Sequence, residues 1–359
     1  MNYLDRHIIQ RLFVTTLFVL LVLIFIFIVI DFSESSDEFT DKGATFNEII
    51  NQYYLNYIPE MVRLVTPVAV FIACLLVTGQ MSDRFEIVAL KAAGVSLYRL
   101  FIPYFIFAII TSAAISYLDG YIVPDTNAER IDFEEKYLQD AGSQLERNQI
   151  FRQESDSTII NINYYEGSDS TAFRVDIYSF NQNHLARFIH TPRMQWSRDT
   201  DKWKLHNGYT RVFTEHGYTQ LEFEQLDTLL NIRPQDLART SSDIYQLTYS
   251  EGAQYIETLK RSGAGNIGLP QTQFYGRLSY PLSIIVVVLI GFAISSVRRK
   301  GGKGVYIASG FIISFLYLAF MKIIEPFGSS GGLDPIWASL IPHLTFLVVG
   351  LILLLTARK

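Results

Sequence analysis

The sequence is poor in the residues that build redox, metal and nucleotide sites. Its single cysteine, Cys74, excludes an internal disulfide. The six histidines are scattered, with no His-x-x-x-His pair and no paired cysteines, which argues against a metal centre. The glycine-rich run "KGGKGVYIASG" lacks the Gly-x-x-x-x-Gly-Lys-Ser/Thr spacing, so it cannot cradle a nucleotide phosphate. We therefore expect neither a cofactor nor an ATPase site in this chain.

Long apolar runs, by contrast, are abundant. The first, "LFVTTLFVLLVLIFIFIVI", carries no charge and, at about 1.5 Å per residue, can cross the roughly 30 Å hydrocarbon layer of a bilayer. It is longer than the apolar region of a signal peptide, so we expect it to be retained. The runs predict six membrane spans, at Leu12–Ile30, Leu64–Met81, Phe101–Leu118, Leu282–Val297, Val305–Met321 and Ile336–Thr356.

The distribution of lysine and arginine predicts the orientation of these spans. Basic residues gather before span one, between spans two and three, between spans four and five, and at the C-terminus. The first loop on the other side, "DFSESSDEFTDKGA", is acidic. Because cytoplasmic loops are enriched in Lys and Arg, both termini are predicted to be cytoplasmic. The net charge of −5 averages these two sides and does not indicate nucleic-acid binding.

A polar insertion separates spans three and four, from about residue 120 to residue 270. Apolar residues alternate there with polar ones at Ile160, Ile162, Phe173, Val175 and Ile177. Alternation of period two, broken by turn signals, predicts an all-β sandwich or jelly roll outside the cytoplasm. After the strands, Thr248 and Glu251 fit a capping box and Gly263 fits a helix end, which predicts a helix that returns the chain to the membrane.

Between spans two and three lies a short charged stretch, "SDRFEIVALKAAGVSLYRL". Its apolar residues, such as Val88 and Leu90, and its charged residues, such as Arg84, Glu86 and Lys91, predict a helix on the cytoplasmic side. Such a helix either lies in the membrane interface or docks into a groove of a soluble partner.

One motif suggests an alternative function. The sequence "GSSG" at residues 328–331, with His343 in the next span, resembles the serine and histidine of a rhomboid-type intramembrane protease, in which His343 would deprotonate Ser330. Ser330 lies in a connecting loop, however, and the β insertion has no place in such an enzyme. As plain structure, "FGSSGGLDP" is a flexible turn.

Five stretches, taken in order along nearly the whole chain, resemble the LptF/LptG family of lipopolysaccharide export permeases. They are "LDRHI", "DRFEIVALKAAGVS", "KWKLHNG", "YGRLSYPLS" and "WASLIPH". The "LDRHI" start is more similar to the LptG branch. The resemblance implies a helical membrane protein with a periplasmic jelly roll: residues 1–119 with a coupling helix at about 82–97, residues 120–270 as the jelly roll and connecting helix, and residues 271–359.

The resemblance also implies a mechanism and a set of partners. In a bacterial inner membrane, the chain and a sibling LptF or LptG permease would form a cavity that extracts lipopolysaccharide. An LptB-like ATPase dimer would dock on the coupling helix, through Arg84, Glu86, Ala93 and Gly94. LptC-like and LptA-like bridge proteins would then receive the lipid.

The lipid-contacting residues are harder to infer, because the region outside span one is acidic where better-known family members carry lysines. The candidate cations are Lys42, Arg63 and Lys322, although Lys322 could simply pair with Glu325 one turn on. For the acyl chains, the candidates are Phe25 in span one and the jelly-roll residues Ile160, Ile162, Phe173, Val175 and Ile177.

Overall fold

The computed structural model describes residues 3–137, 150–155, 157–166, 169–181, 184–197, 202–214, 217–230, 232, 234, 237, 241–261, 267–296 and 302–357. The chain divides into two compact units. The helical unit comprises Met1–Leu138, Tyr245–Tyr249 and Gly268–Lys359, and the β unit comprises Gln139–Ile244 and Ser250–Ile267.

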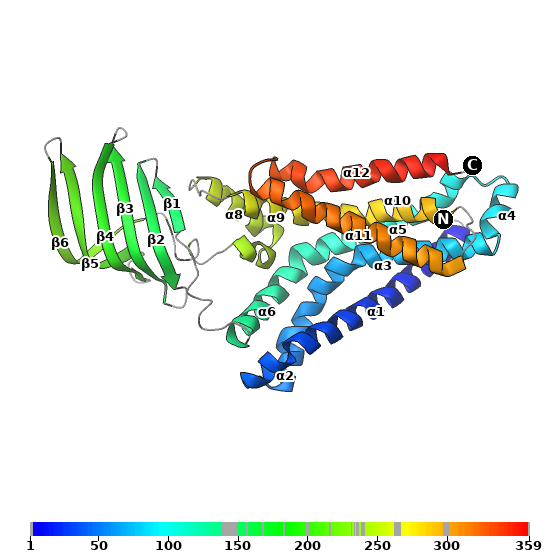
Figure 1. The fold of residues 1–359 in the computed structure, drawn as a ribbon, viewed down its shortest axis with the longest axis horizontal. Helices are drawn as coiled ribbons and strands as arrows, with labels where there is room; N and C mark the ends of the chain where they lie inside the picture. The colour runs from blue at the N-terminus through cyan, green and yellow to red at the C-terminus, as the bar shows by residue number, and fades with distance from the viewer. Residues whose placement is uncertain are drawn as a thin grey trace. The chain divides into compact units, whose positions relative to one another are not determined.

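The helical unit is built from long helices joined by short breaks (Figure 1). Its N-terminal part contains α1 (Tyr3–Asp41), α2 (Phe46–Glu48), the π-helix η1 (Ile49–Tyr54), α3 (Leu55–Asp83), α4 (Glu86–Ala92), α5 (Leu97–Tyr117), the π-helix η2 (Leu118–Ile122) and α6 (Val123–Tyr137). Its C-terminal part contains α9 (Gly268–Ser279), α10 (Leu282–Ser295), α11 (Gly302–Ser329) and α12 (Pro335–Thr356).

Five helices in the described part of the chain are long and apolar enough to cross a membrane, and α9 with α10 makes a sixth if this pair, bent by 50°, is one span. The six expected spans therefore have helical counterparts, but their limits differ. α1 continues through the acidic segment to Asp41, and the fourth span, if the bent pair forms it, begins earlier than expected, with the polar helix α9. Val297 and the basic residues 298–300, 358 and 359 lie outside the described residues.

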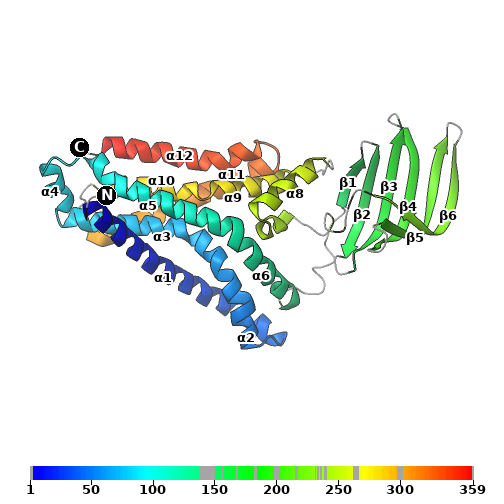
Figure 2. The ribbon, with the colours of Figure 1, turned by 180° about the vertical axis from the view of Figure 1, so that it is seen from behind.

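α3 is the central helix of this unit. In its most apolar stretch 78% is buried, against 17% for α1, which packs on its side (Figure 2). Where α10 crosses α3, a side-chain carbon on Gly291 would come within 2.9 Å of the Phe71 ring. Glycine at this position thus allows the two helices to approach closely, as small residues do between membrane helices.

The β unit contains six antiparallel strands, whose sheet order follows the sequence. They are β1 (Ile150–Ser155), β2 (Thr158–Glu166), β3 (Thr171–Asn181), β4 (His184–Ser197), β5 (Lys202–Thr214) and β6 (Gly217–Thr228). After η4 (Ser241–Gln246), α8 (Tyr249–Arg261) begins where the Thr248 capping signal predicts a helix, whereas Gly263 lies outside the described residues. The expected membrane helical protein with an inserted β domain is confirmed, and the described strands of that domain form a single sheet.

One face of this sheet forms a closed apolar core. Its buried residues include Ile160, Ile162, Val175, Ile177, Trp203 and Leu205, and they pack with Ile232 and Leu237 from beyond β6. The Trp203 indole N–H donates to the Ile232 carbonyl oxygen at 2.8 Å. The cover over this face is therefore held by a hydrogen bond as well as by apolar contact.

Phe173 does not share this face, contrary to the expectation from alternation. Arg174 has φ +51°, so the alternation of β3 breaks there, and Ala172 rather than Phe173 is buried with Val175. Phe173 instead stacks on Tyr164, at 5.6 Å between ring centroids.

Candidate functional site

The helical unit contains an apolar cavity of about 500 Å³. Its walls come from α1, α3, α9, α11 and α12, and the apolar side chains among them include Leu23, Phe27, Val65, Val68, Leu318 and Met321. A cavity of this size with such walls suits a hydrocarbon chain.

Charged residues line one part of the cavity: Arg63, Arg277, Lys322 and Glu325. Lys322 is exposed, and its ammonium donates to the Glu325 carboxylate at 2.7 Å. The ring of Tyr245 also lines the cavity, with the guanidinium carbons of Arg63 and Arg277 at 5.4 Å and 5.7 Å from its centroid. Cation–π contact with one ring therefore helps to hold both arginines here.

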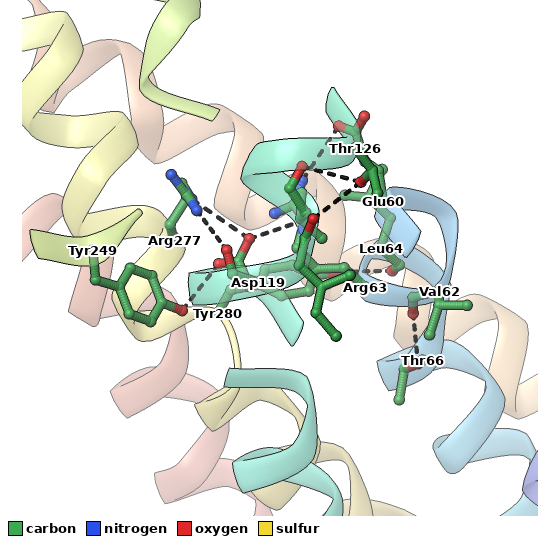
Figure 3. Close-up of polar contacts among 12 residues, drawn as sticks. Glu60, Val62, Arg63, Leu64, Thr66, Asp119, Thr126, Tyr249, Arg277 and Tyr280 are labelled. Carbon is green, nitrogen blue, oxygen red and sulfur yellow. Dashed lines mark hydrogen bonds and ion pairs between the residues drawn. The ribbon is translucent and has the colours of Figure 1, made fainter. Parts of the chain in front are cut away.

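Behind this lining, the two arginines share the carboxylate of Asp119, which is 1% exposed (Figure 3). Asp119 Oδ1 lies 3.4 Å from Arg63 Nε and 3.5 Å from Arg277 Nε. The Tyr249 hydroxyl donates to Asp119 Oδ2 at 3.1 Å. Burial and the Asp119 carboxylate raise the pKa of Tyr249 to about 12, so this hydroxyl keeps its proton at neutral pH.

The network extends to further charges on α3 and α6. Glu60 lies 3.5 Å from Arg63 and 3.2 Å from Arg130, which also pairs with Glu134 at 2.8 Å. The three arginines thus face three carboxylates. Removing one partner of such a buried set leaves an uncompensated charge, which typically costs about 3–5 kcal/mol.

A second buried polar group is centred on His343 of α12. The ring of His343 is 3% exposed, and its two nitrogens hydrogen-bond the Tyr317 hydroxyl and Ser279 Oγ. Because both nitrogens are engaged with these partners, His343 is not paired with Ser330, whose backbone N–H donates to Pro326 O in the turn after α11. This geometry does not support the serine–histidine pair of the protease alternative.

At the other end of the span helices, α4 is shorter than the expected helix at about 82–97. It is preceded by Phe85 in the left-handed conformation (φ 60°) and followed by Ala93, its C-cap, and Gly94 (φ +84°). The Glu86 carboxylate lies 4.0 Å from both Arg11 and Arg84. The side chains of Phe85 and Val88 are about half exposed, so α4 presents an apolar surface beside a carboxylate.

The start of α1 is also tied to the residues after α4. Arg99, in the first turn of α5, donates two hydrogen bonds to the buried Asp5 carboxylate, at 2.8 Å and 2.9 Å. Arg11, two turns further along α1, donates to Gln80 and faces Glu86. α1 is therefore connected to α5 through Asp5 and to α3 and α4 through Arg11.

Comparison with known proteins identifies the protein family of this chain. The family model described as lipopolysaccharide export system permease LptF/LptG matches residues 6–356. The chain belongs to the LptF/LptG family. It is 22% identical to LptG of Escherichia coli strain K12 over 355 residues, 98% of each chain, and 24% identical to LptG of Haemophilus influenzae over 354 residues, 97% of each chain.

Members of the LptF/LptG family are transport permeases rather than enzymes, and ATP hydrolysis belongs to a separate subunit of the export complex. The expected membership and permease function are thus confirmed, and nothing supports the protease alternative. The family and the apolar helices indicate a multi-pass protein of the inner membrane.

Within this LptF/LptG permease, the structure separates the residues expected to contact lipid. Arg63 and Lys322 line the cavity, whereas Lys42 is an exposed residue just after α1. Phe25 is 68% exposed and does not line the cavity, although Leu23 and Phe27 on the same helix do. Phe25 is two residues from each of them, and two residues correspond to a rotation of about 200° around a helix, so its side chain points to the other side.

The sequence interpretation missed Asp119 and Arg277, as well as Arg130 and Glu134 of the extended network. Asp119 directly follows the third apolar run, and Arg277 lies just before the fourth. Opposite charges at the ends of two spans are a signal that could have suggested a pair, since ionisable groups near a membrane are usually paired or functional.

Proposed function

We propose that the chain is the LptG-type permease subunit of an ABC transporter that extracts lipopolysaccharide from the inner membrane and passes it to a periplasmic bridge. The observation that carries this proposal is the cavity, with apolar walls from five helices and Arg63, Arg277 and Lys322 along one part. This combination is complementary to an amphiphile that has acyl chains and an anionic headgroup.

The partners follow from the same assignment. A sibling LptF-type permease completes the transport path, and an LptB-like ATPase dimer docks on α4 through Glu86 with Arg84, Ala93 and Gly94. The apolar side chains exposed beside the Glu86 carboxylate support this docking surface. The Lys and Arg distribution supports cytoplasmic termini and a periplasmic β unit, which hands lipid to LptC-like and LptA-like proteins.

For the β unit, we propose that acyl chains contact the face that carries Ile160, Ile162, Val175 and Ile177. These side chains are at most 3% exposed, so lipid reaches them only after Ile232 and Leu237 have moved away. Phe173 is not among the buried residues of this face, so we do not include it in the proposed row.

The cavity assignment is tested with a photo-crosslinking residue placed at Phe27 or Phe25 in the assembled transporter. We expect Phe27 to capture lipopolysaccharide, with capture falling on addition of ATP as lipid leaves. Phe25 is the matched control, because it lies on the same helix but outside the cavity lining, and it should capture bulk phospholipid. Equal capture of lipopolysaccharide at both positions, or capture at Phe25 alone, would contradict this location of the lipid.

A further inference from the structure

Asp119 occupies an unusual position beside the lipid cavity. It is buried on the π-helical turn η2, and π-helical turns are rare and frequently found at functional sites. Its Oδ1 atom is shared by Arg63 and Arg277, both of which line the cavity. The carboxylate therefore lies against the same two cations that an anionic lipid group in the cavity would meet.

The contacts of this shared oxygen are long. Its distances of 3.4 Å and 3.5 Å to the arginine Nε atoms exceed the about 2.7–2.9 Å of a charge-assisted hydrogen bond. A phosphate or carboxylate with several oxygens could bind both guanidinium groups with better geometry. The Asp119 carboxylate therefore compensates both arginines without a close hydrogen bond to either Nε atom.

Asp119 also holds together two segments of the helical unit that are far apart in sequence. Tyr249 donates to its side chain, while Arg277 donates to the carbonyl oxygens of Asp119, at 2.6 Å, and Leu247, at 2.9 Å. The Tyr249 ring packs so closely on Gly120 that a side-chain carbon there would lie 2.6 Å from it. The turn after α5 and residues 245–249 are therefore joined through Arg277 and Asp119 (Figure 3).

We propose that Asp119 competes with the anionic group of the bound lipid for Arg63 and Arg277, and that its displacement releases residues 245–249 from the turn after α5. This inference rests on the proposed function, because it assumes that the cavity takes an anionic amphiphile. Lipid binding would then break the contacts between residues 245–249 and the turn after α5.

The experiment compares the parent transporter with D119N and with D125N, the same change at an exposed position on α6. Lipopolysaccharide, the same lipid after enzymatic dephosphorylation, and inorganic phosphate are added in turn. Lipid capture at Phe27 gives the affinity, and amide hydrogen exchange of residues 245–249 gives the state of their contacts with the turn after α5.

In the parent and in D125N, we expect phosphorylated lipid alone to accelerate exchange of residues 245–249. In D119N, the Tyr249 hydroxyl loses its charged acceptor while Arg277 keeps its bonds to the two main-chain carbonyls, so exchange without lipid should be faster than in the parent. The affinity for phosphorylated lipid should rise by about fivefold or more, the lower end of typical site-to-site couplings. Free phosphate should have no effect, because it lacks the acyl chains that the apolar walls bind. If D119N assembles poorly, the increase in its Tm on adding lipid replaces the affinity measurement. This increase should be larger in D119N than in the parent, since in D119N the lipid supplies the negative charge that compensates both arginines.

Three results would overturn the inference while leaving the proposed function intact. The first is normal capture of lipid with no change in exchange, and the second is an unchanged or lower affinity in D119N. The third is a full response to dephosphorylated lipid or to free phosphate. Absence of lipopolysaccharide capture in the parent would overturn the proposed function and this inference with it.

Discussion

Replacing Trp203 with alanine is expected to unfold the β unit. The side chain is fully buried, and its indole donates to the Ile232 carbonyl oxygen. Truncating a buried tryptophan costs about 3–5 kcal/mol, a large part of the roughly 5–15 kcal/mol that stabilises a typical domain. Limited proteolysis and hydrogen exchange of the intact transporter should show exposure of residues 150–237, with the helical unit still protected.

Trp196→Ala is the matched control for this prediction. Trp196 lies opposite Trp203 on the neighbouring strand, with 5.2 Å between the ring centroids, but it is only partly buried. Its truncation should therefore cost much less. Equal protection losses in the two variants would show that the core does not depend on Trp203 and its bond to Ile232.

Glu86→Ala should separate the permease from its ATPase. The carboxylate is partly exposed on α4 beside exposed apolar side chains, which is the composition of a docking site. Loss of a central interface contact commonly costs about 2 kcal/mol or more, which corresponds to about 30-fold weaker association. Pull-down of the ATPase and lipid-stimulated ATP hydrolysis measure this loss.

Two controls separate docking from a structural effect at α4. Asp83→Ala removes a carboxylate from the end of α3, just before α4, and should leave association nearly unchanged. Arg11→Ala removes the contact between Glu86 and α1 without removing the carboxylate. If Arg11→Ala weakens association as much as Glu86→Ala does, the role of Glu86 is to position α4 and not to contact the ATPase.

The apolar runs sufficed to predict the spans because a bilayer demands long uncharged helices, whatever the rest of the fold does. They could not predict that α1 continues to Asp41, since polar residues carry no signal for a helix that has left the hydrocarbon layer. The polar helix α9 was missed for the same reason. Its residues, Arg277 among them, resemble a loop until the helices around them are placed.

The site was only half visible in the sequence. The sequence identifies Arg63 as a cation near the edge of a span, but its partner Asp119 is 56 positions away and only packing brings them together. In the β unit, alternation identified Ile160, Ile162, Val175 and Ile177 correctly as one buried row. It failed for Phe173 because Arg174 has a positive φ, which interrupts the alternation. Arginine has no preference for positive φ, so the sequence gives no signal of this irregularity.

The bend between α9 and α10 changes the barrier that a charged headgroup meets. α10 has 14 residues and is about 21 Å long, whereas the hydrocarbon layer is about 30 Å thick. If α9 and α10 are one span, the remaining depth at this crossing falls to α9, whose Thr272, Gln273 and Arg277 line the cavity. The apolar helix of this crossing is then about 9 Å shorter than the hydrocarbon layer is thick, by the same helix rise. An anionic headgroup beside α9 would meet polar side chains at a depth where the surrounding lipid offers none.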